Sequence, residues 1–392
     1  MKQNIRLLVG IIIIIIMVAG FAELMAYVGS AYMIRYPVGF TPLNITESYE
    51  GYLTRYHYDP LLGWKSKVLN DDGNYRDLSG SGPTMSGHSQ GQTLACVSLY
   101  GDSFTEGYGV KPKDSWSSLL SNLLHCRVVN FGVSGYGTDQ AYIKFLNNHR
   151  DRGKVVILGF LTENIMRNVN QLRNLLSTSA TCILKPRFIL NEQGELTLIP
   201  LPHLTKQEYD TLLTNPEAIL HHEFYVPDGP SGYQKMEFPY IWGFLKAFPV
   251  IFKNVVLRRG SYYDLYSPGN PSHAVEITLA IMEAFSREAR QRGQQPVILI
   301  IPTHIDLAYY RRHKIWIYHP ITDYLTKKGL DFLDVGPTFL HFMGESGVKT
   351  LYNPKTMYHL SEKGNVILAE AVYDYLIRKN FDLVKTGKTA SR

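Results

Sequence analysis

Four short segments of the sequence carry the residue types that nucleophilic catalysis requires. Ser103 directly follows an apolar run at residues 95–100, and Gly135, Asn164 and His359 follow later apolar runs. A serine hydroxyl becomes an effective nucleophile when a nearby imidazole takes its proton. Backbone N–H groups and a side-chain amide can then stabilise the oxyanion that forms at the attacked carbonyl. These residues predict attack on a carbonyl carbon, with Ser103 as nucleophile, His359 as base, and a glycine N–H of residues 132–137 and the Asn164 amide as oxyanion donors.

The segments around these residues alternate between two patterns. Short apolar runs indicate buried strands, and the stretches between them have helical spacing, several opened by a residue suited to capping. Strands that alternate with helices predict a parallel sheet covered on both faces, which is a three-layer α/β fold. Ligands bind such a sheet at the carboxyl ends of its strands, where the candidate residues fall. We expect five strands, at 95–100, 127–131, 155–160, 296–301 and 330–335, and helices at 115–124, 138–149, 274–291, 315–328 and 361–377.

A long insertion at about residues 165–270 interrupts this alternation. Within it we expect a hairpin formed by residues 187–190 and 196–199. The aromatic segment 238–252 allows three interpretations. It lines a sugar or acyl pocket by stacking, it lies on a membrane surface as an amphipathic helix, or it packs the insertion onto the sheet.

The N-terminal segment has the length and composition of a membrane anchor. Residues Leu7 to Ala22 are unbrokenly apolar, and after Glu23 the apolar character resumes as far as Ile34. A run of this length can cross about 30 Å of hydrocarbon as a helix, whereas the apolar region of a cleaved signal peptide spans only about 7–15 residues. We therefore predict an uncleaved single-pass anchor.

The charges near this run predict its orientation. Lys2 and Arg6 precede the run and favour a cytoplasmic N-terminus, so the remaining chain is expected to be extracytoplasmic. We divide the chain into an anchor, residues 1–35, a juxtamembrane and linker segment, residues 36–93, and an α/β domain, residues 94–392. The linker assignment rests on residues 70–92, which are dominated by Gly, Ser, Asp and Asn.

Composition argues against several other functions. The net charge of 40 − 34 = +6 is too small over 392 residues to indicate nucleic-acid binding. The three cysteines, Cys96, Cys126 and Cys182, are too few for a disulfide framework, and we expect buried small side chains rather than reactive thiols. The adjacent His221 and His222 lack metal-ligand spacing. We expect no metal and no organic cofactor.

The ordered set of motifs resembles the SGNH, or GDSL, hydrolase superfamily. Gly101-Asp-Ser-Phe-Thr105 resembles its first block and implies that Ser103 supplies both the nucleophile and one oxyanion N–H. Asn130-Phe-Gly-Val-Ser-Gly135 resembles the second block and implies that Gly135 is the next oxyanion donor. Asn164 resembles the third block, although Leu-Thr-Glu-Asn replaces the usual Gly-x-Asn-Asp. His359, followed by Leu360 and Ser361, resembles the last block. The resemblance covers residues 94–380 apart from the insertion, and it implies a flavodoxin-like five-stranded sheet.

One position departs from this resemblance. The superfamily usually places an aspartate three residues before the histidine, and here that residue is Thr356. Four alternatives stay open: a backbone carbonyl holds His359, an acid from elsewhere such as Asp334 or Glu163 substitutes, a shift of register brings another group, or hydrolytic competence is lost. Loss of the orienting acid of a triad can cost about 10⁴ in rate.

The resemblance implies a serine-dependent esterase that acts on O-acyl esters through an acyl-enzyme. Similar anchored proteins add or remove O-acetyl groups on polysaccharides, so an exported or cell-wall glycan is the expected substrate. The alternatives are a polysaccharide O-acetyltransferase with the same nucleophile, or a catalytically silent binding or assembly subunit of a polysaccharide export complex. The expected partners are an O-acylated substrate, the membrane and, in the last alternative, export proteins, but no nucleic acid.

Overall fold

The computed structural model describes residues 2–34, 38–55, 58–65, 84–85, 95–257, 262–344 and 347–381. The chain divides into two compact units. Unit 1 comprises residues 1–54, 170–184 and 202–264, and unit 2 comprises residues 55–169, 185–201 and 265–392. Most of the predicted linker at 70–92 and residues 382–392 lie outside the described residues.

A six-stranded sheet forms the centre of unit 2, in the order β10-β9-β6-β4-β5-β3. The five strands predicted from the sequence are parallel to one another, and β3 adds an antiparallel edge. Nearly all residues of β4, β5, β6 and β9 are buried, as expected for strands that are covered on both faces. The strands are β3 (Thr84–Met85), β4 (Val97–Tyr100), β5 (Val128–Asn130), β6 (Val155–Leu161), β9 (Gln295–Ile301) and β10 (Phe332–Asp334). The α/β fold class with a five-stranded parallel sheet is confirmed.

The strand order reverses direction at β4. The chain passes from β4 to β5 on one side and then returns to β6 on the other. Reversal of this kind opens a crevice beyond the carboxyl ends of the strands, and ligands of open α/β sheets bind there. Ser103 follows β4 by three residues and therefore lies at the carboxyl edge of the sheet, where the strand order reverses.

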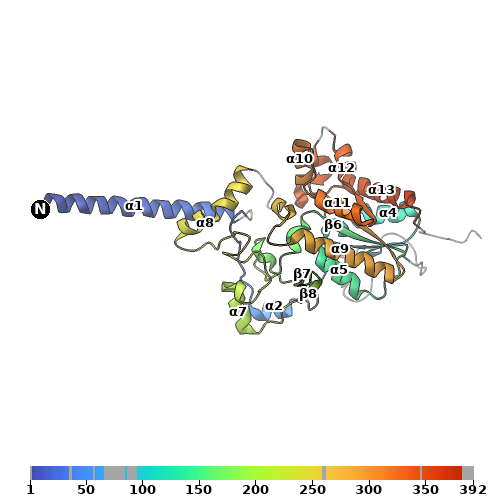
Figure 1. The fold of residues 1–392 in the computed structure, drawn as a ribbon, viewed down its shortest axis with the longest axis horizontal. Helices are drawn as coiled ribbons and strands as arrows, with labels where there is room; N and C mark the ends of the chain where they lie inside the picture. The colour runs from blue at the N-terminus through green and yellow to red at the C-terminus, as the bar shows by residue number, and fades with distance from the viewer. Residues whose placement is uncertain are drawn as a thin grey trace, which may run out of the picture. The chain divides into compact units, whose positions relative to one another are not determined.

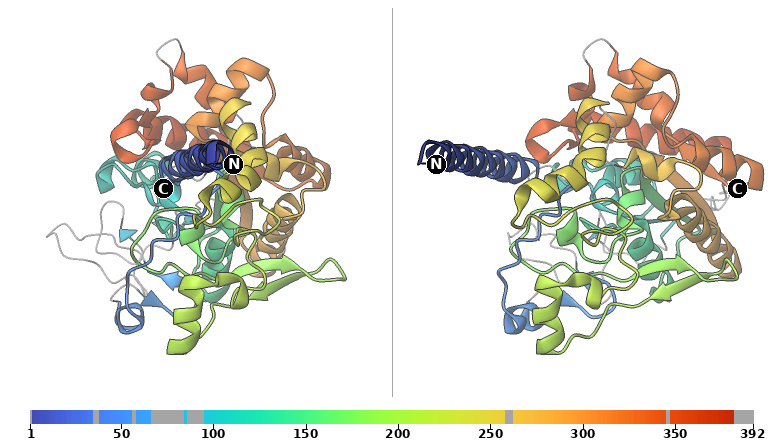
Figure 2. Two further views of the ribbon diagram at one scale, coloured as in Figure 1. Left: turned by 90° about the vertical axis from the view of Figure 1, so that its left-hand side faces the viewer. Right: turned by 60° about the vertical axis from the view of Figure 1, so that its left-hand side comes forward.

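Helices cover both faces of the sheet (Figures 1 and 2). α4 and α13 pack together on one face, and α5 and α9 pack together on the other. The bounds are α4 (Trp116–Leu124), α5 (Thr138–Asn147), α9 (Ala274–Gln291), α11 (His319–Lys328) and α13 (Glu362–Arg378). Ser115 and Ser361 cap α4 and α13 by accepting hydrogen bonds from Ser118 N and Gly364 N. The cap at Ser115, where the sequence predicts that a helix opens, thus determines where α4 begins.

Cys96 and Cys126 form a disulfide, which corrects the interpretation of both as buried thiols. Cys96 immediately precedes β4 and Cys126 lies just before β5. Because β4 and β5 are adjacent parallel strands, their starting points are neighbours, and the two Cα atoms are 6.1 Å apart. Cys182 is free and buried, as expected.

The remaining elements of unit 2 are short and surround the sheet. The predicted hairpin is present: Arg187 lies opposite Ile199 at one end and Leu190 lies opposite Leu196 at the other. These elements are β1 (Tyr58–Asp59), β2 (Gly63–Trp64), α3 (Ser103–Glu106), α6 (Asn164–Arg167), β7 (Arg187–Leu190), β8 (Leu196–Ile199), α10 (His304–His313), α12 (Gly336–Met343), β11 (Tyr352–Asn353) and β12 (His359–Leu360).

Unit 1 contains the helices α1 (Lys2–Met33), α2 (Tyr49–Thr54), α7 (Lys206–Thr214) and α8 (Tyr240–Ile251). Within α1, residues Asn4–Met33 are long and apolar enough to cross a membrane. In the irregular part of unit 1, the buried carboxylate of Glu223 accepts hydrogen bonds from the backbone N–H groups of Gln171, Leu172 and Tyr225 and from Asn170 Nδ2. These four donors hydrogen-bond the buried carboxylate and hold the segment 170–172 to residues 223–225.

Candidate active site

Ser103 lies at the beginning of α3, directly after the turn that leaves β4. The carboxylate of Asp102 caps α3 by accepting a hydrogen bond from Phe104 N at 2.9 Å. Gly101 is required before it, because a Cβ at this position would lie 2.0 Å from Thr105 Oγ1. This tight turn presents Ser103 at the sheet edge, with its side chain largely buried.

His359 contacts Ser103 directly. The Nε2 atom of His359 lies 2.7 Å from Ser103 Oγ, and Nδ1 lies 2.6 Å from the carbonyl oxygen of Thr356. A carbonyl can only accept, so Nδ1 carries the proton and donates it. In the neutral ring Nε2 is therefore the unprotonated nitrogen that can accept the Ser103 hydroxyl proton.

The backbone around His359 explains this contact. β11 and β12 pair as a small antiparallel hairpin, with Asn353 opposite His359. Thr356 Oγ1 and Tyr358 N both donate to the Asn353 carbonyl, at 3.1 and 3.0 Å. Met357 and Tyr358 have φ values of 52° and 58°, which turn the chain sharply and bring the Thr356 carbonyl to His359 Nδ1.

Of the four alternatives for His359, the structure contains the first, a backbone carbonyl on Nδ1. Asp334 instead accepts hydrogen bonds from Tyr318 OH and Gly336 N. Glu163 pairs with Arg167 at 3.3 Å. Neither acid contacts His359 in the described structure.

Aromatic rings enclose the imidazole of His359. Phe104 stacks on it with ring centroids 4.9 Å apart, and Tyr108 lies at 4.8 Å with its own ring 46% exposed. Next to it, Tyr358 stacks on His304 at 3.9 Å. Burial lowers the pKa of His304, which favours its neutral form beside the site. The exposed Tyr108 ring offers a stacking surface next to the Ser103–His359 pair.

Gly135 lies in a loop that Asn130 fastens to the serine turn. Asn130 Nδ2 donates to Thr105 O at 2.7 Å, Asn130 Oδ1 accepts from Gly132 N, and Val133 N donates to Gly101 O at 3.0 Å. Gly135 itself has φ 85°, a conformation that favours glycine.

Trp64 supports the same loop from outside the predicted α/β domain. Its Nε1 donates to Ser134 O at 3.0 Å, and Tyr136 OH donates back to the Trp64 carbonyl at 2.7 Å. A Cβ at Gly135 would touch the Trp64 ring at 3.4 Å. Residues 58–65 therefore help to shape the candidate oxyanion loop, a role that the sequence pattern of an irregular segment did not reveal.

Asn164 is completely buried beside the serine turn. Its Nδ2 donates to Asp102 Oδ2 at 3.1 Å, and an amide nitrogen carries a second hydrogen for another acceptor. The structure thus places Asn164 next to the residue that precedes Ser103.

Arg167 connects these parts and was not singled out in the sequence. Its guanidinium donates to Asp102 Oδ2 at 3.4 Å and to Tyr136 O at 2.9 Å. Burial raises the pKa of the Asp102 carboxyl, and the Arg167 charge opposes that rise. The only available signal was a basic residue three positions after Asn164 in a buried helical turn.

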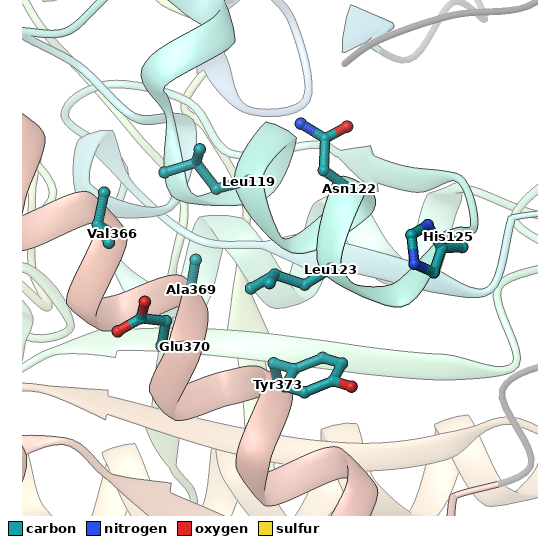
Figure 3. Close-up of a pocket in the computed structure, with 8 residues that line it drawn as sticks. All are labelled: Leu119, Asn122, Leu123, His125, Val366, Ala369, Glu370 and Tyr373. Atoms are coloured by element: carbon teal, nitrogen blue, oxygen red, sulfur yellow. The ribbon is translucent and has the colours of Figure 1, made fainter.

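The described residues contain no cluster of three or more His, Cys, Asp or Glu side chains that could hold a metal ion. A surface hollow of about 530 Å³ lies between α4 and α13 (Figure 3), lined by Leu119, Asn122, Leu123, His125, Val366, Ala369, Glu370 and Tyr373. None of the candidate site residues contributes to it.

No protein-family model and no curated protein sequence matches the chain. Among solved structures it is similar to a lipolytic protein of the G-D-S-L family from Desulfitobacterium hafniense, with 12% identity, coverage of 71% of this chain and 98% of that one, and a TM-score of 0.36. It is also similar to a variant of Axe2, an acetyl-xylooligosaccharide esterase from Geobacillus stearothermophilus. The identity is 12%, the match covers 77% of this chain and 100% of that one, and the TM-score is 0.38. A lipolytic protein of the G-D-S-L family from Veillonella parvula is 11% identical, with coverage of 72% of this chain and 98% of that one and a TM-score of 0.34. Similarity this low identifies neither a substrate nor a reaction.

The fold and the site geometry of this chain define its class. Ser103 follows the central strand at the reversal of strand order, and an imidazole with the required tautomer contacts it. Together with the Gly135 loop and Asn164, these features make the chain an α/β protein with a hydrogen-bonded serine–histidine pair at the carboxyl edge of its sheet.

Proposed function

We propose that the protein is a serine-dependent esterase of SGNH type that acts on O-acyl esters through an acyl-enzyme. The observation that carries this proposal is the continuous hydrogen-bonded line from the Thr356 carbonyl through His359 to Ser103 Oγ. It leaves Nε2 free to accept a proton from the attacking hydroxyl, which is the requirement for activating a serine.

In the first half-reaction, Ser103 Oγ bonds to the ester carbonyl carbon while its proton passes to His359 Nε2. The oxyanion accepts hydrogen bonds from the Ser103 and Gly135 N–H groups and from Asn164 Nδ2. The tetrahedral intermediate then releases the alcohol, which takes the proton from His359, and the acyl group stays on Ser103. In the second half-reaction His359 deprotonates water, which attacks the acyl-enzyme and frees the carboxylic acid and Ser103.

Two observations support the assignment of the oxyanion donors. As the first residue of α3, Ser103 has an N–H without an acceptor inside that helix. Arg167 bonds both Asp102 and the Tyr136 carbonyl, so it fixes the serine turn and the Gly135 loop to each other. Pre-organised donors of this kind are each worth about 3–4 kcal/mol of barrier.

We further propose that the ester lies on an exported or cell-wall glycan, and that the α/β domain faces the outside of the cell. The Cys96–Cys126 disulfide supports this location, because disulfides persist in oxidising compartments. The α1 helix supports attachment to a membrane. The exposed Tyr108 ring beside His359 supports a sugar substrate, since aromatic rings offer an apolar face to a sugar ring.

The activity test uses the full chain in detergent, with p-nitrophenyl acetate and a serine-reactive fluorophosphonate. We expect hydrolysis and covalent labelling, and we expect both to be lost in Ser103→Ala and His359→Ala. Ser267→Ala, at an exposed turn serine, is the matched control and should retain both. Absence of labelling in the wild-type protein would favour the catalytically silent subunit instead.

A second measurement separates the esterase from an O-acetyltransferase with the same nucleophile. The acyl-enzyme is formed with p-nitrophenyl acetate, and its decay is followed with and without acetyl-free oligosaccharide. An esterase releases acetate at the same rate in both. A transferase holds the acyl group until the sugar is added and then yields acetylated oligosaccharide.

A further inference from the structure

Residues 238–257 of unit 1 expose an unusual number of large apolar side chains. The exposed fraction of Trp242 is 61% and that of Phe238 is 73%. The segment comprises α8 and the π-helical turn Phe252–Val256 that continues it. Its exposed apolar residues are Phe238, Ile241, Trp242, Leu245, Phe248, Phe252, Val255, Val256 and Leu257.

This exposure is not the polar outer face of an ordinary surface helix. The other face of α8 is apolar too, since Ala247 and Ile251 are buried against Phe40. Lys246 is the only charged residue of the helix, and it reaches Asp228 at 2.9 Å. A helix that is apolar all round is normally buried. The uncovered face of α8 therefore requires an apolar environment.

The neighbour of α8 within unit 1 is the last third of α1 (Figure 1). The rings of Tyr27 and Tyr240 lie 5.0 Å apart. Further along both helices, a Cβ at Gly29 would lie 3.2 Å from the Phe244 ring. The small residues Ala26 and Ser30 of α1 are also buried, and small residues permit close helix packing in membranes. The apolar surfaces of α1 and α8 are consequently continuous.

The length of α1 places this contact near one surface of a bilayer. Its 32 residues extend about 48 Å at 1.5 Å per residue, whereas a hydrocarbon core of about 30 Å needs about 20 residues. With Arg6 at one boundary, the core ends near residue 25. Glu23 then lies just inside the opposite boundary, and the contacts of Tyr27 and Gly29 with α8 lie at the level of the headgroups.

Glu23 supplies a second, independent link between the helices. A carboxylate in an apolar span is costly unless it is paired. Its Oε2 accepts hydrogen bonds from Tyr240 N at 2.7 Å and from Ile241 N at 3.4 Å, the first N–H groups of α8. The positive end of the α8 dipole stabilises this negative charge. Glu23 thus fixes the start of α8 at the depth where α1 leaves the hydrocarbon.

We propose that α8 and the turn after it lie in the interfacial layer of the bilayer that α1 crosses, with their exposed apolar side chains among the acyl chains. This inference rests on the membrane anchor and is independent of the esterase proposal. The occupant of the apolar face is phospholipid. Trp242 and the neighbouring aromatic residues have the composition of an interfacial aromatic belt.

The test reconstitutes the full chain in vesicles of phosphatidylethanolamine and phosphatidylglycerol whose acyl chains carry bromine, a quencher of tryptophan. We expect bromine near the glycerol end to remove most of the Trp242 emission, and bromine at the chain terminus to remove less. Trp242 emission is obtained as the difference between wild type and Trp242→Phe. The variant Trp242→Phe/Leu245→Trp moves the fluorophore along the same exposed face and should restore the quenching.

Co-flotation with the vesicles tests the anchor separately. If the protein floats but Trp242 is not quenched, the anchor holds and the α8 proposal is overturned. Shielding of this face by a second copy or by another protein gives that same result. If the protein does not float, the proposal fails together with the anchor.

The role of Glu23 is tested by Glu23→Leu, with Glu23→Gln as the matched variant that keeps an acceptor oxygen. In vesicles, Glu23→Leu should accelerate hydrogen exchange at the N-terminus of α8 at least tenfold, and Glu23→Gln should change it much less. Equal exchange in the two variants would contradict the capping contact. The wild-type quenching result decides the α8 proposal even where Glu23→Leu fails to fold.

Discussion

The carbonyl oxygen of Thr356 accepts a hydrogen bond from His359 Nδ1 at 2.6 Å, where a catalytic triad would place an acidic side chain. A carbonyl fixes the tautomer and the ring orientation as a carboxylate does, but it brings no negative charge to stabilise the imidazolium. The pair Ser103–His359 is therefore a dyad supported by the backbone.

This relationship predicts that the Thr356 side chain is dispensable. Thr356→Ala retains the carbonyl, so kcat/KM for p-nitrophenyl acetate should change little. Glu163→Gln and Asp334→Asn should also leave kcat/KM nearly unchanged, because neither carboxylate contacts His359. A fall of about 10⁴ in any one of the three would instead identify that residue as the orienting group of a triad.

Gly109 should be needed for the position of the Thr356 carbonyl. It has φ 93°, and a Cβ there would lie 3.0 Å from Thr356 Cβ. Gly109→Ala should shift the hairpin that holds His359 and lower kcat/KM by about 100-fold, the scale of an ångström-sized misplacement. Gly269→Ala is the matched control, since Gly269 has φ 71° but open space around it. Equal losses in the two variants would show that backbone strain, and not the Thr356 contact, is responsible.

Arg167 should stabilise the fold in a pH-dependent way. Burial raises the pKa of Asp102, and removal of the Arg167 charge should raise that pKa further. In Arg167→Met the protonated Asp102 costs little free energy at low pH, whereas the charged form is left buried without a cationic partner as pH rises. Unfolding measurements should therefore show a deficit near pH 8, about 3 kcal/mol, that shrinks toward pH 5. Arg152→Met, at an exposed arginine, should show no such pH dependence; a deficit independent of pH in Arg167→Met would contradict this account.

Asp334 should have the opposite effect on stability when it is neutralised. Burial raises the pKa of its carboxyl from 3.8 to about 6. The folded protein then binds the proton more tightly than the unfolded chain, so stability is lost as pH rises from about 4 to 6. Asp334→Asn keeps an oxygen for Tyr318 OH and Gly336 N. We expect Asp334→Asn to raise the Tm at pH 7.5, and at pH 4 to leave the Tm unchanged or to lower it. A lower Tm at pH 7.5 would contradict the raised pKa of Asp334.

The Cys96–Cys126 disulfide should contribute measurably to stability. It joins residues separated by 30 positions, which in the chain-entropy account corresponds to about 3.5 kcal/mol. Reduction, or the double variant Cys96→Ala/Cys126→Ala, should lower the denaturant midpoint, whereas reductant should not affect that double variant. Thiol titration of the unfolded, unreduced chain should detect one cysteine, Cys182. Three thiols in protein isolated from its native compartment would contradict the disulfide.

Local sequence patterns determined most of the sheet. Runs such as 155–160 and 296–301 are apolar over strand length, and the helical spacing of 274–291 needs no distant partner to be recognised. The positions of Ser103, Gly135 and Asn164 after strands of the sheet follow from the same periodicity, because parallel strands bring their carboxyl ends to one edge. His359 instead lies on the separate β11–β12 hairpin, which the periodicity does not place. The N-terminal apolar run likewise predicted a long apolar helix, and α1 is that helix.

Only the tertiary structure decided what each of these residues contacts. The group that orients His359 is a main-chain carbonyl, and every residue has one, so no residue type marks it. Trp64 and Arg167 reach the Gly135 loop across 70 and 31 positions of sequence, and Cys96 meets Cys126 because two strands are neighbours. Glu23 and Tyr240, 217 positions apart, form a contact that gives a charged residue in an apolar helix its partner. Such contacts depend on how elements pack, whereas a sequence pattern reports only how each element buries its own surface.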